Sequence, residues 1–406
     1  MDNSQENVIG KKRVLLGITG GVAAYKSAEL LRLMTKSGMD VRVVMTEAAT
    51  RFVGTATFQA LSGQSVHTSL WDPRIPDGMA HIELSRDRDL IVVAPATADF
   101  MARIANGFAD DLLTTLCVAR RCPLMVAPAM NVEMWENAAT RANVARLKDQ
   151  GVAILGPGVG EQACGETGYG RMLEPDQILD GVVATFAPKV LSGKRVLVTA
   201  GPTAEPIDTV RVLTNISSGK MGYAVAQAAV EAGAHVTLVS GPTALAVPAG
   251  VRRIDVQTAQ QMYDAVLPLA READIFIAVA AVADYRPAKV STRKLKRGTG
   301  GIALDLVPNP DILAAVAAMK NGPFCVGFAA ESENLREYAQ VKRKKKNIPL
   351  LAANLVQNAF GQDSNALTLF DDNGEHELQR APKLVLARKL LLHVASMVGR
   401  RPKKRK

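Results

Sequence analysis

Residues 191–222, LSGKRVLVTAGPTAEPIDTVRVLTNISSGKMG, decide how this chain is organised. The segment KRVLVT at 194–199 nearly repeats KRVLLGIT at 12–19. In both places a basic pair precedes a short apolar run that ends near Thr and Gly. This pattern is typical of the buried first strand of a parallel α/β domain. The sequence therefore predicts that a similar fold begins twice.

The second start carries an insertion. From Val14 to Val41, in the next predicted strand, the chain advances 27 residues, whereas from Val196 to Val236 it advances 40. The surplus is a polar, Pro- and Ser-containing loop, 201–219, at the predicted carboxyl edge of the sheet. Open α/β sheets bind ligands at that edge. The insertion therefore predicts a binding site of its own.

The repeated start predicts an α/β chain with two Rossmann-like parallel-sheet domains, and the length and composition agree with a globular chain of two or three domains. The 406 residues exceed one typical domain, and 48% apolar with 22% charged residues describe a globular chain. No apolar run reaches the roughly 18 residues of a membrane span. The first ten residues lack a signal-peptide pattern. We expect a cytoplasmic protein with domains over 1–190 and 191–406.

The net charge of +10 raises the question of the binding partner. Part of it is concentrated at 342–346 and in a basic tail at about 399–406. Nucleic-acid binding is one interpretation, but aromatic residues are only 4% and no binding module is recognisable. Anionic small substrates suit the charge better, and the tail is interpreted as a solvated end. The four cysteines form no Cys-x-x-Cys pair, which argues against a structural zinc site.

Glycines and two Ala-Pro-Ala segments predict a pocket in the first half. Gly20 and Gly21 follow the first strand and precede a helix expected over 22–37. They are typical of a phosphate-binding turn, although G-x-G-x-x-G is absent and a plain tight turn remains an alternative. Two further apolar runs break at Ala-Pro-Ala, 94–96 and 127–129, and then present a small polar group. Alanines at one sheet edge would allow a flat ligand to approach.

His81 and Cys164 are candidates for proton transfer. A lone histidine is more often a packed or surface residue, but His81 follows a Pro/Gly loop at 72–78, which strengthens the case for a proton-handling role. Cys164 lies among five glycines in 158–171, which predicts a mobile flap. A cysteine there can donate a proton or act as a thiolate. The alternative is an incidental exposed cysteine.

Five motifs of the first half together resemble the flavin-containing cysteine decarboxylases, in particular those that act on 4′-phospho-N-pantothenoylcysteine. They are GITGG at 17–21, His81, APATAD at 94–99, PAMN at 128–131 and ACGETGYGR at 163–171. The resemblance implies a flavodoxin-like flavoprotein domain. It implies FMN bound by Gly20, Gly21, Thr46, Pro95, Thr97 and Asp99.

The same resemblance implies a mechanism and three roles. The flavin would oxidise the cysteinyl thiol to a thioaldehyde, which accepts the electrons of the departing carboxylate, and would then return a hydride. His81 would be the catalytic base. Asn131 would hold the substrate carboxylate, and Cys164 would supply the last proton.

The second half must bind any nucleotide without a Walker loop, because SGKM at 218–221 does not fit that motif. Other groups are available. Asp284 follows a buried strand predicted at 274–280, and Lys294 lies on a segment expected to be flexible. Lys342 and Lys346 lie one helical turn apart, although a solvated helix face would explain that pair as well.

The motif TxEPIDxVRxxxNISSGKMG at 203–222, with the later groups in the same order, resembles the phosphopantothenate–cysteine ligases over nearly all of the second half. The whole chain is thus similar to the bacterial family in which this ligase is fused behind the decarboxylase. The implied reaction joins the carboxylate of 4′-phosphopantothenate to CTP, with Mg²⁺, as an acyl-cytidylate. The cysteine amine then displaces CMP.

The resemblance also implies roles in the ligase. Lys294 would stabilise charge during acyl-cytidylate formation, and Asn215, with Arg211 nearby, would hold the intermediate. KLKR at 294–297 departs from the family's Lys-x-Lys-Lys but keeps its charge. Metal ligands are not implied. CTP would contact Ala278, Val279, Ala280, Asp284, Lys294, Pro310, Asp311, Ile312, Leu313, Phe328, Lys342 and Lys346.

Two alternatives to a bifunctional enzyme remain. One is a flavoprotein whose second half only regulates or assembles, which the presence of Asn215, Asp284 and Lys294 disfavours. The other is an NAD(P)-dependent oxidoreductase, which the missing fingerprint disfavours. The resemblance further implies a homo-oligomer, a dodecamer built from decarboxylase trimers and ligase dimers, with no nucleic-acid or membrane partner.

Overall fold

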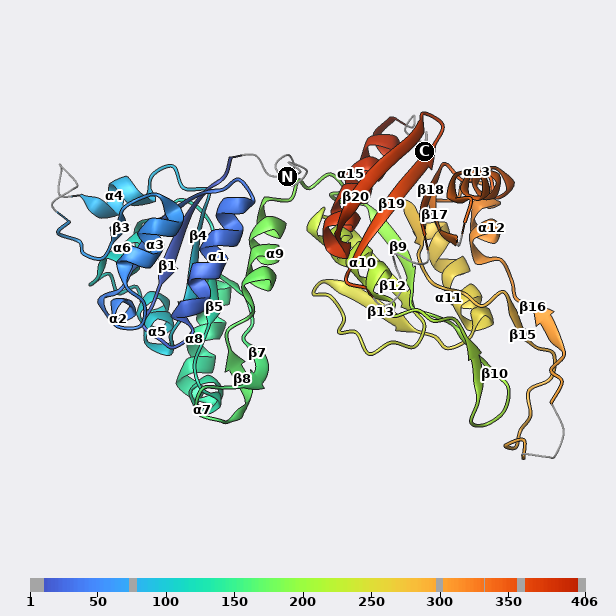
Figure 1. Ribbon diagram of the computed structural model, residues 1–406, viewed down its shortest axis with the longest axis horizontal. Coiled ribbons are helices and arrows are strands. Elements are labelled where there is room, and N and C mark those ends of the chain that lie inside the picture. The colour runs from blue at the N-terminus through green and yellow to red at the C-terminus, as the bar shows by residue number, and fades with distance from the viewer. Residues whose placement is uncertain (1–10, 73–78, 297–301, 332, 356–361, 401–406) are drawn as a thin grey trace. The chain divides into compact units, whose positions relative to one another are not determined.

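The computed structural model describes residues 11–72, 79–296, 302–331, 333–355 and 362–400. The chain divides into two compact units, Met1–Ala187 and Pro188–Lys406 (Figure 1). Most of the basic tail lies outside the described residues. Among the described residues, none of the helices combines the length and apolar character needed to cross a membrane.

A six-stranded parallel sheet forms the centre of the first unit. Its strand order is β3-β2-β1-β4-β5-β6, the order of doubly wound nucleotide-binding sheets. The predicted apolar runs form β1, β2, β4 and β5, and nearly all residues of β1, β4 and β5 are buried. The strands are β1 (Arg13–Ile18), β2 (Asp40–Met45), β3 (Val66–His67), β4 (Leu90–Ala96), β5 (Leu124–Pro128) and β6 (Ala153–Ile154).

Helices cover both faces of this sheet because strand residues alternate between two cores. Val14 and Leu16 pack with α1 (Ala24–Lys36), α3 (Thr55–Ser62) and α9 (Pro175–Phe186). Leu15 packs on the other face. That face carries α4 (Ala80–Ser85), α5 (Ala98–Ala105), α6 (Leu112–Ala119) and α8 (Ala138–Asp149). Short helices α2 (Glu47–Thr50) and α7 (Val132–Glu136) follow strand ends. The predicted α/β class is confirmed.

The second unit repeats this arrangement and extends it. Its sheet has the order β13-β12-β9-β14-β17-β18-β19-β20. The first six strands are parallel and follow the same 3-2-1-4-5-6 pattern, which confirms the repeat predicted from the sequence. They are β9 (Arg195–Ala200), β12 (His235–Ser240), β13 (Val251–Asp255), β14 (Ile275–Ala278), β17 (Phe324–Glu331) and β18 (Leu350–Leu355).

An antiparallel hairpin completes this sheet. Strands β19 (Ser364–Asp371) and β20 (Gly374–Pro382) pair around the turn at 372–373. On one face lie α10 (Lys220–Glu231) and the unpredicted α15 (Lys383–Arg400). On the other lie α11 (Ala259–Glu272), α12 (Ile312–Ala317) and α13 (Leu335–Lys345).

Three small hairpins stand outside the main sheets, and the sequence did not predict their strands. Strands β7 (Gly158–Glu161) and β8 (Thr167–Arg171) form the glycine-rich segment of the first unit. In the second unit, β10 (Ala204–Pro206) pairs with β11 (Val212–Thr214), and β15 (Tyr285–Pro287) pairs with β16 (Leu306–Pro308). Each hairpin begins just after the carboxyl end of a strand of a main sheet. Ligands bind at that edge in this fold class.

Candidate active sites

A cavity of about 640 Å³ opens in the first unit where the strand order reverses between β1 and β4. Its volume is that of a typical cofactor pocket. Five residues predicted from the sequence meet in it: Gly20, Gly21, Thr97, Asn131 and Cys164. Much of the remaining lining is apolar and includes Ala98, Ala129, Met130 and Met134. A flat ring system fits such walls.

The wall between β1 and β4 is fixed by hydrogen bonds from Thr19. Its hydroxyl donates to the carbonyl of Pro95 at 2.8 Å and accepts from the N–H of Thr97 at 3.1 Å. The next residue, Gly20, lies so close to α2 that a Cβ there would stand 2.5 Å from Cβ of Ala48. The turn therefore needs glycine to bring its backbone to the start of α1. A helix N-terminus reached by a glycine turn suits the phosphate of a flavin mononucleotide.

Three other predicted flavin contacts do not line this cavity. Thr46 caps α2 by accepting the N–H of Ala49 at 3.3 Å. Pro95 is buried within β4. Asp99 points to Arg103, with Oδ2 3.1 Å from Nε. The contact of these three residues with a cofactor stays a prediction.

The β7–β8 hairpin packs against the residues that follow β5. Gly170, at φ +139°, lies so close that a Cβ would stand 2.4 Å from the carbonyl oxygen of Met130. Gln162 fastens the tip, because its side-chain oxygen accepts the N–H of Val132 at 3.0 Å. Its amide nitrogen donates to the carbonyl of Tyr169 at 3.1 Å. The predicted flap is thus a hairpin that covers one wall of the cavity.

Glu166 joins the two predicted catalytic side chains of this wall. The thiol of Cys164 donates to its carboxylate at 3.4 Å, and the side-chain nitrogen of Asn131 lies at the same distance from that oxygen. Asn131 also donates to Glu133 at 2.6 Å. Sequence reasoning missed Glu166 as a site residue, although it stands two positions after Cys164 in the motif.

Cysteine exposure separates one candidate from the rest. Cys164 is exposed, whereas Cys117 and Cys325 are buried and Cys122 is half-buried. Burial raises the pKa of the Cys117 thiol to about 12, and it raises that of Cys122 as well. Since only a solvent-accessible thiol can exchange protons readily with a bound substrate, Cys164 is the cysteine suited to chemistry.

His81 is not among the residues lining the cavity. It lies on α4, whose Ala80 and Leu84 pack into the core beside α6. Figure 1 shows α4 near β3, at the side of the unit away from the β7–β8 hairpin. Within one chain, therefore, the structure does not bring His81 to Asn131 and Cys164.

In the second unit, the insertion loop crosses the carboxyl ends of β9 and β14, where that strand order reverses. The N–H of Ala281 donates to the carbonyl of Gly201 at 2.9 Å, and the hydroxyl of Thr203 accepts the N–H of Ala283 at 3.0 Å. Asn215 donates its side-chain N–H groups to the carbonyls of Ala281 and Val282, both at 3.1 Å. Asn215 thus lies at the crevice that the fold predicts as a ligand site.

Several predicted CTP contacts gather beside this crevice. Strand β14 ends at Ala278, and residues 279–280 follow it directly. Phe328 lies on the neighbouring strand, where Ala278 pairs with Gly327. The carbonyl of Asp284 accepts the N–H of Asn309 at 2.8 Å, which brings it to the segment 310–313. The structure therefore joins groups that are far apart in the sequence.

Asp311 and Lys346 form a direct pair, with Oδ1 3.0 Å from Nζ. The same oxygen accepts the N–H of Ala314 at 3.0 Å and caps α12. Burial alone would raise the pKa of Asp311, but this N–H and the Lys346 ammonium together hold it below its usual value. Lys342 lies 3.9 Å from Glu331. The two lysines thus face acidic partners rather than open solvent alone.

Lys294 is exposed on the segment after β15, whereas Arg211 is engaged. The guanidinium of Arg211 is paired with Asp208 and donates to the carbonyl of Leu295 at 2.9 Å. Arg211 therefore contacts the neighbour of Lys294 in the structure. Sequence reasoning did not single out Asp208, because nothing local shows that a loop acid is buried.

Among the described residues, one group of side chains has the composition of a metal site: Asp371, His376 and His393. Each histidine Nε2 faces a different oxygen of Asp371, at 3.2 Å and 2.9 Å. Because β19 runs antiparallel to β18 and Phe370 pairs with Leu351, this group lies near the amino end of β18. It is away from the edge where the nucleotide residues gather.

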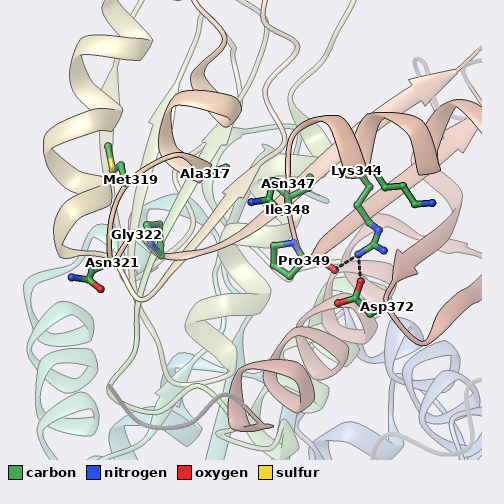
Figure 2. A pocket seen from close by; sticks show the side chains of 11 residues that line it. Ala317, Met319, Asn321, Gly322, Lys344, Asn347, Ile348, Pro349 and Asp372 are labelled. Atoms are coloured by element: carbon green, nitrogen blue, oxygen red, sulfur yellow. Dashed lines mark hydrogen bonds and ion pairs between the residues drawn. The ribbon is translucent and has the colours of Figure 1, made fainter. Parts of the chain in front are cut away.

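A second cavity, of about 600 Å³, also lies at amino ends, because residues 321–323 before β17 and 347–349 before β18 line it (Figure 2). Figure 2 shows Asn321, Lys344 and Asn347 around it, with Asp372 at one side. Arg343 donates to Asp372 at 2.8 Å and to the carbonyl of Pro349 at 3.2 Å. Ligands of open α/β sheets bind at the opposite edge, so this cavity is separate from the predicted ligase site.

Comparisons with known proteins agree on both units. Residues 2–187 match the family model described as Flavoprotein, and residues 191–397 match the model described as DNA/pantothenate metabolism flavoprotein C-terminal domain. The chain is 50% identical over 394 residues to the Coenzyme A biosynthesis bifunctional protein CoaBC of Vibrio vulnificus strain CMCP6, covering 96% of this chain and 98% of that protein.

Relatives with the same name extend to other bacteria. Identity is 48% with the Escherichia coli K12 protein, over 94% of this chain and 96% of the relative. It is 42% with the Bacillus subtilis strain 168 protein, over 96% and 98%. Among solved structures, the C-terminal domain of a CoaBC protein is 42% identical, with a TM-score of 0.46, covering 52% of this chain and 98% of that chain. The FMN binding protein AtHal3 is 36% identical, with a TM-score of 0.38, covering 42% and 95%.

Proposed function

Because this chain belongs to the family of bifunctional coenzyme A biosynthesis proteins, we propose that residues 1–190 carry an FMN-dependent decarboxylase and residues 191–406 a CTP-dependent ligase. The protein is an enzyme of coenzyme A biosynthesis with a flavoprotein unit and a ligase unit. The ligase would join cysteine to 4′-phosphopantothenate, and the decarboxylase would convert the product to 4′-phosphopantetheine. The observation that carries this proposal is the cavity in which Gly20, Thr97, Asn131 and Cys164 meet.

In the first unit, the chain's own residues would bind and orient the substrate. The backbone at Gly20 and Gly21 would receive the FMN phosphate at the start of α1, and the apolar wall would receive the ring. Bound FMN supplies a two-electron acceptor for the cysteinyl thiol and later a hydride. Asn131 would hold the substrate carboxylate until it leaves as CO₂. Cys164, in the turn of the β7–β8 hairpin, would then donate the proton that completes the reduced thiol product.

If His81 is the catalytic base, a second copy of the chain must supply it. One chain does not bring His81 to its own cavity, so a neighbouring copy must supply it if it acts as the base. The cavity would then be complete only in an oligomer. This supports a homo-oligomer of the first unit. The full assembly proposed here, from the family resemblance, is a cytoplasmic dodecamer of decarboxylase trimers and ligase dimers.

In the second unit, a carboxylate must be activated because it is a poor electrophile. The carboxylate of 4′-phosphopantothenate would attack the α-phosphate of CTP, and pyrophosphate would leave. Lys294 would stabilise the negative charge that develops in this step, and Mg²⁺ would accompany the triphosphate. Asn215, fixed at the crevice, would hold the acyl-cytidylate. The cysteine amine would then attack the acyl carbon and release CMP.

A pyrophosphate assay tests the ligase assignment. Lys294→Gln is expected to lose CTP-dependent pyrophosphate release, by roughly a hundredfold or more, because it removes a charge that acts in the transition state. Lys289→Gln removes an equally exposed lysine of the same segment and serves as the control. Wild-type turnover by Lys294→Gln would contradict the role of Lys294.

Subunit mixing tests the decarboxylase assignment. His81→Asn should lose decarboxylation, and Cys164→Ser should stop after CO₂ release and accumulate the oxidised enethiol. Assemblies containing both variants should regain part of the activity, because some sites would combine an intact His81 with an intact Cys164 from another chain. Mixed assemblies that stay inactive would argue against a shared site. A colourless protein that cannot take up FMN would contradict the flavin assignment.

A further inference from the structure

Asp208 is an acid in the insertion loop whose side chain is fully buried, with 0% exposed. Its two carboxylate oxygens do different things. Oδ1 accepts the N–H groups of Val210 and Arg211, both at 2.8 Å, and so closes the turn between β10 and β11. Oδ2 accepts from Nε of Arg211 at 3.0 Å and from the N–H of Leu295 at 3.1 Å. The second oxygen therefore reaches a segment 87 residues away.

Arg211 completes this contact from the other side. Its Nη2 pairs with Asp208 and also donates to the carbonyl of Leu295 at 2.9 Å. The N–H and the C=O of Leu295 are thus both held by the insertion loop. We call this arrangement of Asp208, Arg211 and Leu295 the loop clamp.

The loop clamp accounts for the order of an otherwise irregular segment. In the part of the chain that the structure describes, residues 291–296 form no helix or strand. The hydrogen bonds that the structure gives between this segment and the rest of the chain go to Asp208, to Arg211 and to the carbonyl of Ile207, which accepts the N–H of Ser291 at 3.1 Å. Without these bonds, residues 291–296 would be tied only at their ends.

Asp208 stays charged in this setting. The guanidinium of Arg211 holds the pKa of the Asp208 carboxyl well below its usual range, with help from the N–H groups of Val210, Arg211 and Leu295. Hydrogen bonds to an ionised acceptor are stronger than neutral ones. The loop clamp is therefore suited to fix a backbone position rather than to exchange protons.

We propose that Asp208 is a positioning residue of the ligase reaction, which fixes Lys294 through the adjacent Leu295 backbone. The inference rests on the proposed function, in which Lys294 acts in acyl-cytidylate formation. The loop that ends in Asn215 would thereby also set the place of Lys294. Lys294, which acts in the first step, and Asn215, which acts in the second, would then both be positioned by the insertion loop. Arg211 would contribute through Leu295.

Two substitutions at Asp208 test this without removing the turn. Asp208→Asn keeps an oxygen for Val210 and Arg211 but places an N–H group where Oδ2 was. Asp208→Ser keeps a turn-capping oxygen and leaves that position empty. Both should lower kcat for pyrophosphate release by about 10- to 100-fold, because a displacement of about 1 Å at a reacting group has effects of that size. KM for CTP should change less than about threefold.

Asp372→Asn is the matched control. It breaks another Asp–Arg pair of the same unit, at the amino ends of the strands, and should leave the ligase rate unchanged. Loss of the loop clamp should also speed trypsin cleavage within 289–296, which carries exposed Lys and Arg residues. Retention of the wild-type melting temperature would show that the loss of rate does not come from unfolding.

Normal pyrophosphate release by Asp208→Ser would overturn the proposal, as would a change in KM for CTP with kcat kept. Hydrogen exchange of the wild-type protein gives a test that does not depend on any variant's folding. The amide of Leu295 should exchange slowly, and fast exchange would overturn the loop clamp. A wild-type protein without CTP-dependent pyrophosphate release, or an active Lys294→Gln, would instead contradict the proposed function.

Discussion

Close backbone approach at Gly20 shows how a single residue shapes the flavin site. A Cβ on Gly20 would stand 2.5 Å from Cβ and 2.8 Å from the backbone carbon of Ala48. We predict that Gly20→Ala displaces the turn, costs ~1–3 kcal/mol through overpacking and lowers the FMN retained per chain. Flavin absorbance and thermal unfolding of the purified protein measure the two effects.

Gly54→Ala is the control for this prediction. A Cβ on Gly54 would meet nothing within 4 Å, and the residue lies in the same unit. That variant should keep its flavin and its melting temperature. Equal flavin content in the two variants would show that the turn at Gly20 tolerates a side chain, which contradicts the argument from close approach.

Asp371 gives a prediction on pH. Burial alone would raise its pKa, but the N–H of Asn373 and the side chains of His376 and His393 together hold it below the usual value. A carboxyl group with a lowered pKa in the folded state stabilises that state at neutral pH. This contribution is lost progressively as pH falls below about 5 towards the folded-state pKa.

Asp371→Asn should therefore be less stable than wild type at pH 7, and the difference should shrink as pH falls towards 3. Thermal unfolding between pH 7 and pH 3 measures it. A difference that grows on acidification would contradict the sign of the pKa shift.

At the residue scale, sequence reasoning worked where a motif is contiguous. Cys164, Asn131 and Gly20 were predicted, and all line the same cavity. It did not find Glu166 or Asp208, whose importance comes from contacts across the fold. One partner of Asp208 is the N–H of Leu295, 87 residues away, and no local pattern marks a backbone amide that far along the chain.

The β7–β8 hairpin carries the prediction at the scale of elements. Gly170 combines φ +139° with a close approach to Met130 and Asn131. We predict that Gly170→Ala pushes the hairpin off this wall and lowers decarboxylation by about 10- to 100-fold, since Cys164 would be misplaced. Ligase activity of the same chain should be unchanged.

Gly165→Ala tests whether the hairpin's packing or only its glycine content matters. Gly165 has φ +86°, but a Cβ there would meet nothing within 4 Å. This substitution strains the tip without moving the hairpin, so its effect on decarboxylation should be much smaller. A larger loss in Gly165→Ala than in Gly170→Ala would contradict the prediction.

Buried strands were predictable at the scale of elements because their apolar runs are continuous. The small hairpins were not, because β10, β11, β15 and β16 have only three residues each and lack alternating patterns. Helix α15 was also missed, although its apolar residues recur at helical spacing. Its Leu386, Leu390 and Val394 are in fact fully buried against the sheet.

At the scale of the whole molecule, each unit has its own sheet, cores and candidate site. The repeat in strand order was predictable because KRVLVT and KRVLLGIT begin both sheets. The absence of His81 from the cavity of its own chain was not, because a sequence does not show which side chains the fold brings together. Separate sites predict that damage to one activity leaves the other intact.

Lys294→Gln and Cys164→Ser test this separation. Lys294→Gln should fail with 4′-phosphopantothenate but convert supplied phosphopantothenoylcysteine at the wild-type rate. Cys164→Ser should ligate normally and stop in the second reaction. Mixing the two proteins should restore the complete conversion, because the intermediate can pass between them. Loss of both activities in either variant would contradict independent sites.

The most direct measurement of the central claim is the product formed by the wild-type chain from 4′-phosphopantothenate. The protein is incubated with this substrate, cysteine, CTP and Mg²⁺, and the mixture is followed by mass spectrometry. The account predicts 4′-phosphopantetheine, with one CMP and one CO₂ released for each molecule formed, and none when CTP is omitted. A flavin-loaded protein that forms no 4′-phosphopantetheine, or that forms it equally well without any nucleotide, would contradict the account.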